Sequence, residues 1–166
     1  NKFLISQVNF KLSKKNHRIN TSYKALSDKL IEKGIKDPSI SDISSLVKEI
    51  RESKLPNYNQ LGNAGSFFKN PVLKKKNFEK ITNKYSSMPF YKMSENEYKF
   101  PAAWLIEKCG FKDICENQVG VYKNQSLVII NKGGATGSDI YNFSQKIKQE
   151  VKNKFDILLE EEVNII

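Results

Sequence analysis

The spacing of apolar residues switches along this 166-residue chain between a helical period and short runs that are typical of strands. Helical spacing predicts helices around residues 23–30, 43–50, 78–85, 101–106 and 140–151. Strands are predicted over residues 3–12, 119–122, 127–130, 155–159 and 163–166. The strands show hairpin signals and few strand–helix–strand units, so the sequence predicts an α+β fold.

Breaks in this pattern suggest how the chain is divided. Ser41 is predicted to cap the second helix, with Asp42 in its first turn. Leu55-Pro56-Asn57 ends that helix and marks a boundary. Residues 86–100 are predicted to form a loop with one short strand.

A glycine-rich stretch, Lys132–Gly137, follows a predicted strand and precedes a predicted helix. Lys132 stands where a dinucleotide-binding fingerprint needs a glycine, and no strand–helix–strand unit surrounds it. The stretch is therefore predicted to be a tight turn, with Ser138 as the N-cap of the helix and Asp139 in its first turn.

The formal net charge is +10, and Arg18 and Arg51 are the only arginines among 28 basic residues. Sites that read nucleic-acid bases rely on arginine forks, which lysine cannot reproduce. The charge favours a solvated lysine surface over a nucleic-acid site, and it fits an anionic small ligand equally well. No apolar run approaches the roughly 20 residues of a membrane span, and Asn1–Phe10 lacks the features of a signal peptide. We expect no membrane partner.

Cysteine and histidine are scarce. Cys109 and Cys115 are the only cysteines, which is too few for a disulfide framework or a zinc site, so a reduced cytoplasmic setting is expected. The single His17 lies in a polar loop without metal-ligand companions. No metal site is predicted.

Gly62–Pro71 is dense in small residues and carries the clearest chemical signal. Gly62 and Gly65 allow a backbone path or a close ligand approach that side chains would block. Ser66 presents a hydroxyl that can donate or accept a proton, and Phe67-Phe68 can anchor the segment in a core. A glycine-rich turn with a capping serine is the plainer reading of the same residues.

Glu160-Glu161-Glu162 allows two readings. It is either a solvated acidic run or part of a strand that continues into Val163. In such a strand Glu160 and Glu162 share one face and Glu161 points to the other, so that one carboxylate can be held at a site.

The residues Gly62-Asn63-Ala64-Gly65-Ser66-Phe67-Phe68-Lys69-Asn70-Pro71 resemble the signature of the UDP-N-acetylenolpyruvoylglucosamine reductases, the MurB-type flavoenzymes of peptidoglycan precursor synthesis. Three other stretches agree with the family in order and spacing, namely Arg51–Pro56, Ala103–Glu107 with Cys109, and Leu159–Val163. The match runs over essentially the whole chain, and a signature of this length is specific.

This resemblance implies a two-step reduction with FAD as cofactor and NADPH as co-substrate. The flavin hydride goes to the enolpyruvyl methylene carbon of a UDP-sugar, and Ser66 falls at the position of the serine that protonates the adjacent carbon. Glu162 falls at the position of the glutamate that helps to hold the enol(ate). It must be protonated or act through a donor, because an ionised carboxylate would repel the enolate.

The resemblance also implies binding residues. The positions that contact the substrate in the family are occupied by Lys54, Asn70 and Gln125. A lysine suits a diphosphate, and amides suit phosphate, sugar or uracil edges. The candidate contacts to the flavin are Arg51, Asn63 and Gly65.

In the family an FAD-binding region precedes the part that is seen here. Residues 1–55 would be the C-terminal remnant of that region, residues 56–155 the substrate-binding domain, and residues 156–166 a strand that returns to the first lobe. FAD would then be bound mainly outside this chain, and the chain alone is expected to be inactive. The alternative is a non-redox basic module that binds RNA or a nucleotide-sugar. The oligomeric state is not predicted.

Overall fold

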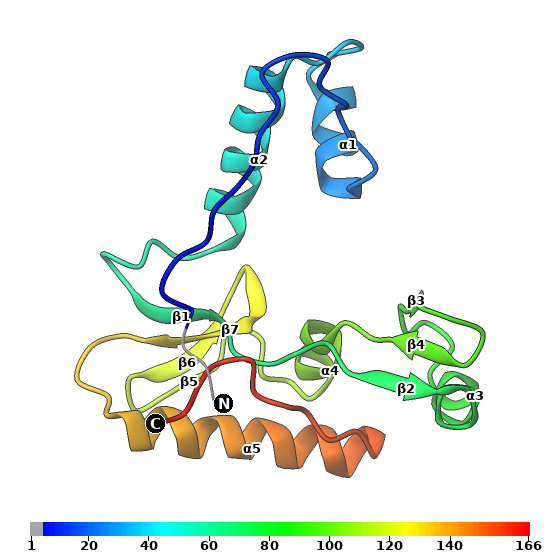
Figure 1. Cartoon of the computed structure of the whole chain (residues 1–166). Coiled ribbons are helices and arrows are strands. Elements are labelled where there is room, and N and C mark those ends of the chain that lie inside the picture. The colour runs from blue at the N-terminus through cyan, green and yellow to red at the C-terminus, as the bar shows by residue number, and fades with distance from the viewer. Residues whose placement is uncertain (1–4) are drawn as a thin grey trace. The chain divides into compact units, whose positions relative to one another are not determined.

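The computed structural model of the chain describes residues 5–166 (Figure 1). Its backbone contacts form two compact units, Asn1–Ile50 and Arg51–Ile166. Every strand pair in the described residues is antiparallel, and helices are interspersed with the strands, which confirms the α+β class.

The first unit holds α1 (Lys24–Glu32) and most of α2 (Ile40–Lys54). Four side chains at helical spacing form its small core, namely Leu26, Leu30, Leu46 and Ile50. α1 ends before Gly34, whose φ of 66° is the left-handed conformation in which many helices stop. Both helices were predicted from their apolar spacing.

The cap of α2 differs from the prediction. Ser39, not Ser41, caps the helix: the Asp42 N–H donates to the Ser39 hydroxyl at 3.2 Å, and the Ser39 N–H donates to the Asp42 carboxylate at 2.8 Å. This reciprocal pair is a capping box, and it starts the helix at Ile40.

The predicted strand over residues 3–12 is wrong for the part that is described. Residues 5–12 have no regular secondary structure and are exposed, with Phe10 at 80% and Leu12 at 81%, and residues 3 and 4 lie outside the described part. Apolar alternation forms a strand only against a neighbouring strand, and no described residue pairs with this segment.

The second unit is built on a four-stranded antiparallel sheet in the order β1-β7-β6-β5. Its strands are β1 (Gly62–Ser66), β7 (Gln125–Asn131), β6 (Val119–Tyr122) and β5 (Cys115–Glu116). α4 (Ala102–Lys108) and the long α5 (Gly137–Phe155) pack against this sheet, as Figure 1 shows for α5. The β6–β7 hairpin, α4 and α5 were predicted.

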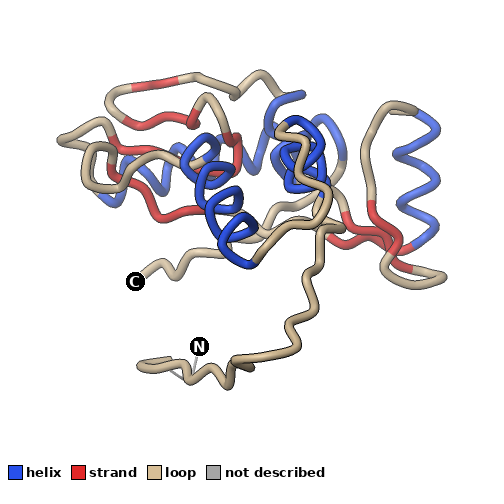
Figure 2. Tube along the Cα trace, turned by 90° about the horizontal axis from the view of Figure 1, so that it is seen from above, coloured by secondary structure: helices blue, strands red, loops and turns tan. Residues whose placement is uncertain are grey.

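Residues 86–100 were predicted to form a loop with one short strand, but they hold two strands of a smaller sheet in the order β2-β4-β3. It consists of β2 (Val72–Lys74), β4 (Glu97–Lys99) and β3 (Tyr91–Lys92), and α3 (Lys75–Lys84) lies beside it (Figure 2). Phe78 of α3 stacks on Tyr98 of β4, with 3.7 Å between the ring centroids. The strands of only two or three residues left too little periodicity to detect.

The turn before α5 is tight, as predicted, but its cap is Thr136 and not Ser138. The Thr136 hydroxyl accepts from the Asp139 N–H, and the Asp139 carboxylate accepts from the Thr136 N–H at 2.8 Å. The Asn131 side chain closes the turn by accepting from the Gly133 N–H at 2.9 Å and donating to the Ala135 carbonyl at 2.9 Å.

The strands predicted over residues 155–159 and 163–166, and the return strand over residues 156–166, are not strands in the structure. Phe155 still belongs to α5, and the segment that follows is extended with a single β-bridge, Phe68–Glu161. Ile157 and Leu159 are nevertheless buried in the core of this unit. Packing of alternate side chains, more than a strand ladder, holds the segment in place.

Candidate functional site

The C-terminal segment pairs with the end of the glycine-rich segment. The Lys69 N–H donates to the Glu160 carbonyl at 2.9 Å, and the Glu162 N–H donates to the Phe67 carbonyl at 2.8 Å. Ser66 directly precedes Phe67, so its backbone lies one position from the residue that pairs with Glu162. The two predicted catalytic residues, from opposite ends of the second unit's sequence, are therefore brought into one neighbourhood.

Ser66 stands at the end of β1, just after a bulge. Gly65 has a φ of 72°, a conformation that glycine adopts without strain. Asn63 stabilises this turn, since its side chain accepts from the Gly65 N–H at 3.1 Å and donates to the Leu61 carbonyl at 2.9 Å. Among residues 5–166, no side chain or backbone group forms a hydrogen bond with the Ser66 hydroxyl, which is half-buried.

The two phenylalanines after Ser66 anchor this loop, as the sequence predicted. Phe67 and Phe68 are both buried, and their rings meet edge to face with 5.1 Å between centroids. Ser66 is therefore held between a glycine turn on one side and two core side chains on the other.

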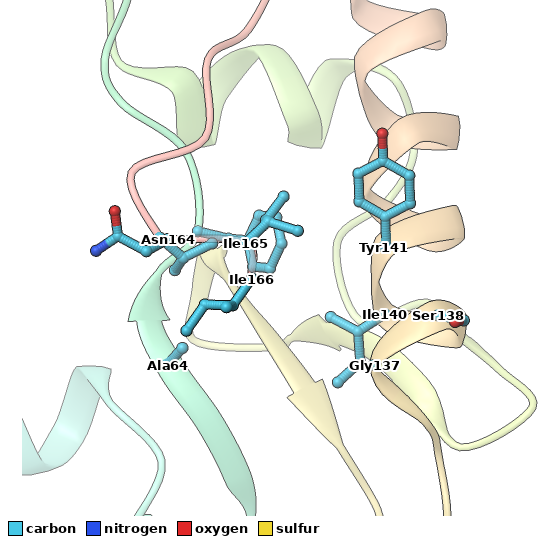
Figure 3. A pocket seen from close by; sticks show the side chains of 10 residues that line it. Ala64, Gly137, Ser138, Ile140, Tyr141, Asn164, Ile165 and Ile166 are labelled. Atoms are coloured by element: carbon cyan, nitrogen blue, oxygen red, sulfur yellow. The ribbon is translucent and has the colours of Figure 1, made fainter. Parts of the chain in front are cut away.

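A cavity of about 610 Å³ opens beside this pairing, between the C-terminal segment and the first turns of α5 (Figure 3). In Figure 3, Ile140 of α5 points toward the C-terminal segment that carries Ile165. The walls of the cavity are formed by Ala64, Phe67, Gly137, Ser138, Ile140, Tyr141, Val163, Asn164, Ile165 and Ile166. The cavity thus borders β1 near Ser66 and the chain just after Glu162, and its walls are mainly apolar.

The three consecutive glutamates have different environments. Glu160 and Glu162 are exposed, and Glu160 forms an ion pair with Lys69 at 3.3 Å. Glu161 is half-buried and contacts α5 through Lys148. The exposure of the three side chains follows the alternation that the sequence predicted, although the backbone forms only one β-bridge.

Two of the predicted substrate-binding residues lie near each other. Lys54 is the last residue of α2, and Gln125 is the first residue of β7, where its side chain accepts from the Leu127 N–H at 3.3 Å. The side chain of Asn124 donates to the Ser53 carbonyl at 2.9 Å, and this bond ties the end of α2 to the β6–β7 turn.

The third predicted substrate-binding residue, Asn70, contacts the first residue of α4. Its side-chain oxygen accepts from the Ala102 N–H at 2.8 Å, so it satisfies one of the unpaired N–H groups of that helix. The two N–H donors of the Asn70 side chain remain available to a ligand.

Of the candidate flavin contacts, Asn63 and Gly65 belong to the turn before Ser66, whereas Arg51 borders a separate cavity of about 570 Å³ along residues 51–59. In the described part of the chain, no three His, Cys, Asp or Glu side chains gather in a way that could hold a metal ion. No helix within residues 5–166 is long and apolar enough to cross a membrane.

The sequence reasoning missed the contact between α5 and the C-terminal segment. Gln145 and Lys148 both donate to Glu161. Their spacing of three residues places them on one helix face, which was the available signal. Their partner, Glu161, was predicted only to face away from Glu160 and Glu162.

The fold and this site define an α+β domain in which a glycine-rich serine loop is completed by an acidic C-terminal segment. The model of the family described as UDP-N-acetylenolpyruvoylglucosamine reductase, C-terminal domain, matches residues 56–166, and the chain belongs to this family.

Several curated proteins with the name UDP-N-acetylenolpyruvoylglucosamine reductase are similar to the chain. The protein from Flavobacterium johnsoniae is 49% identical over 99% of this chain and 49% of its own length. Those from Amoebophilus asiaticus and Pseudomonas aeruginosa are 42% and 35% identical, each over 99% of this chain and 48% of their own lengths. The chain spans about half the length of these curated relatives.

Proposed function

We propose that this chain is the substrate-binding part of an NADPH- and FAD-dependent oxidoreductase. The complete protein would reduce UDP-N-acetylglucosamine enolpyruvate to UDP-N-acetylmuramate, for peptidoglycan precursor synthesis in the cytoplasm. The observation that carries this proposal is the pairing that brings Glu162 next to the Ser66 loop, since these are the two positions to which the family's chemistry assigns roles.

Ser66 would donate a proton to the substrate. Once the methylene carbon has gained a hydride, the adjacent carbon carries a negative charge that spreads into the neighbouring carboxylate. A hydroxyl is a weak acid, and only such a strongly basic centre takes a proton from it readily. The half-buried Ser66 hydroxyl is suited to this donation because the described part of the protein does not engage it in a hydrogen bond.

Glu162 would stabilise the enol(ate) before protonation. Donors aimed at a developing negative charge lower the barrier of such a step. For this role the carboxyl must carry a proton or act through a bound donor. Its backbone is fixed by the hydrogen bond to Phe67, whereas its side chain is exposed and can turn toward a ligand.

FAD, when bound, supplies the hydride. The turn at Gly65 is the part of this chain that fits a flavin. Apart from the chain neighbours of Gly65, no described residue fills the space where a side chain would stand at this position. A flat ring can therefore approach the backbone beside Ser66. Arg51 and Asn63 are the other candidate contacts, and most of the cofactor site would lie outside this chain.

Lys54 and Gln125 would bind the nucleotide end of the substrate. The Asn124–Ser53 hydrogen bond holds the end of α2 against the β6–β7 turn, so a diphosphate at Lys54 would lie near the side-chain amide of Gln125 at the start of β7. Asn70 would contact the sugar or phosphate through its amide nitrogen, because its oxygen is engaged by α4.

Absorption spectroscopy of the full-length gene product tests the proposal. A flavin spectrum that NADPH bleaches, and that returns only when the enolpyruvyl UDP-sugar is added without oxygen, supports it. A colourless full-length protein that binds RNA or a UDP-sugar without redox change would replace it with the non-redox alternative.

A further inference from the structure

The least exposed ion pair in residues 5–166 joins α5 to the C-terminal segment. Lys148 donates to both oxygens of Glu161, at 2.7 and 2.9 Å, and the side chains are 17% and 20% exposed. Gln145, one turn earlier on the same face of α5, donates to Glu161 at 3.0 Å. The pair between Lys146 of the same helix and Glu116 of β5 is far more exposed, at 50% and 43%.

Burial gives this contact a fixed geometry. An exposed ion pair adds little because water competes for both charges, whereas a shielded carboxylate with three donor contacts has few alternative arrangements. Burial alone would disfavour the charge on Glu161, but the hydrogen bonds from Lys148 and Gln145 outweigh it and hold the pKa of this carboxyl below its ordinary value. Glu161 is therefore ionised and held at neutral pH.

The contact lies next to the proposed catalytic pair. Glu161 is opposite Phe68 in the β-bridge and directly precedes Glu162, whose N–H donates to Phe67. A shift of Glu161 along or away from α5 moves the peptide that carries Glu162, and it moves the backbone that follows Ser66 as well. Of the ion pairs that the three glutamates form with described residues, Lys148–Glu161 is half-buried, whereas Lys69–Glu160 is exposed.

We propose that Lys148 and Gln145 are positioning residues that fix Glu162 relative to Ser66 by holding Glu161 on α5. This inference rests on the proposed function, because it assigns a purpose to the placement of Glu162. It adds two residues of α5, Gln145 and Lys148, to the determinants of the rate.

The test separates the two half-reactions of the complete enzyme by stopped-flow spectroscopy, with Lys148→Met as the main variant and Lys146→Met as the matched control. Lys148→Met should slow substrate-dependent flavin reoxidation by about 10- to 100-fold, the usual effect of a small displacement of reacting groups. NADPH-dependent flavin reduction and the KM for the UDP-sugar should stay near the wild-type values. Lys148→Arg should recover most of the lost rate, and Lys146→Met should behave as the wild type.

A merely structural role gives a different result. Lys148→Met would then lower the melting temperature while each folded, flavin-loaded molecule turns over at the wild-type rate, and this outcome overturns the inference. If Lys148→Met does not fold, Gln145→Met removes one of the three hydrogen bonds to the Glu161 carboxylate, together with a longer one to Ser144, and should show a smaller loss in the same half-reaction. An unchanged rate of substrate-dependent reoxidation in Gln145→Met would count against the inference. A wild type without substrate-dependent reoxidation overturns the proposed function itself, and this inference with it.

Discussion

Ser66 is placed by its neighbours. The Gly65 turn and the Phe67–Phe68 anchor fix its backbone, and the Asn63 side chain holds the turn from inside. The side chain itself contributes no hydrogen bond to the described part of the fold. Removing the hydroxyl is therefore expected to change the chemistry without changing the structure.

In the complete enzyme, Ser66→Ala should leave NADPH-dependent flavin reduction nearly intact. Transfer from the reduced flavin to the substrate should slow by about 10²- to 10⁴-fold, the range typical of lost acid catalysis. Stopped-flow measurement of the two half-reactions checks this. Normal turnover of Ser66→Ala would remove the serine from the mechanism.

Glu162→Gln should slow the same substrate half-reaction by about 10²-fold or more, because it alters the group that we propose stabilises the enol(ate). Glu160→Gln is the exposed control and should be near neutral. Glu161→Gln should be mild, since its amide oxygen still accepts from Lys148. Equal losses in all three variants would favour a solvated acidic run.

Lys54→Ala should mainly raise the KM for the UDP-sugar. A surface charge contact of about 1 kcal/mol corresponds to about a fivefold change in binding, and the effect should shrink as salt is added. Lys48→Ala, an exposed lysine earlier in α2, is the control. An unchanged KM for Lys54→Ala at low salt would leave Lys54 without a role in binding.

At the scale of elements, the features that depend on neighbours in sequence were predictable. The apolar spacing gave α1, α3, α4 and α5, because a helix satisfies its hydrogen bonds within one segment. Both corrected caps follow one rule: the true cap lies three residues before an aspartate, at Ser39 before Asp42 and at Thr136 before Asp139. The spacing of a capping box would have found them.

Features that depend on distant partners were not predictable. Residues 5–12 alternate but pair with no described strand, whereas β3 and β4 are too short to alternate and yet form a sheet. The candidate site divides in the same way. Ser66 and Glu162 were proposed as site residues from the resemblance, but the Lys148–Glu161 contact requires α5 and the C-terminal segment to be placed side by side.

The Lys148–Glu161 contact should also appear in the pH dependence of stability. The pKa of Glu161 is lower in the folded protein than its ordinary 4.5, so its stabilisation is complete above about pH 4.5 and is lost as the pH falls through the folded value. The melting temperature of Lys148→Met should lie below that of the wild type at neutral pH, and this gap should narrow in acid. Thermal melts from about pH 3 to pH 7 check this.

The same melts need a control, because Asp42 and Asp139 also have lowered pKa values and titrate in acid. Hydrogen bonds from Ser39 and Thr136, respectively, cause those shifts, and they are present in every variant. Lys146→Met should therefore track the wild type at each pH. If the difference in melting temperature between Lys148→Met and the wild type stays constant as the pH falls, the assignment of the pH dependence to the Lys148–Glu161 contact is contradicted.

At the scale of the whole molecule, this 166-residue chain is expected to lack the means to hold FAD alone. The glycine-rich stretch Lys132–Gly137 is a helix-capping turn, in which the N–H groups of Gly133 and Thr136 donate to the side chains of Asn131 and Asp139. The only arginines of the chain are Arg18 and Arg51, and neither stands in the glycine-rich signature.

Purification of this chain with excess FAD should therefore yield a colourless protein that catalyses no NADPH oxidation. Gel filtration followed by absorption spectroscopy checks this, with the complete enzyme as the positive control. A stoichiometric yellow complex, or NADPH oxidation that depends on the enolpyruvyl substrate, would place the flavin site within these residues.

The backbone pairing of residues 67–69 with residues 160–162 also has a consequence for how the protein is made. Lys69 and Glu160 lie 91 positions apart in the chain. At a synthesis rate of about 5 to 20 residues per second, the serine loop waits roughly 5 to 18 s on the ribosome for its partner to be translated. Until then the buried Phe67 and Phe68 have no cover from residues 160–162. Products that stop before residue 160 should therefore be bound by chaperones or degraded, rather than accumulate as slow enzymes.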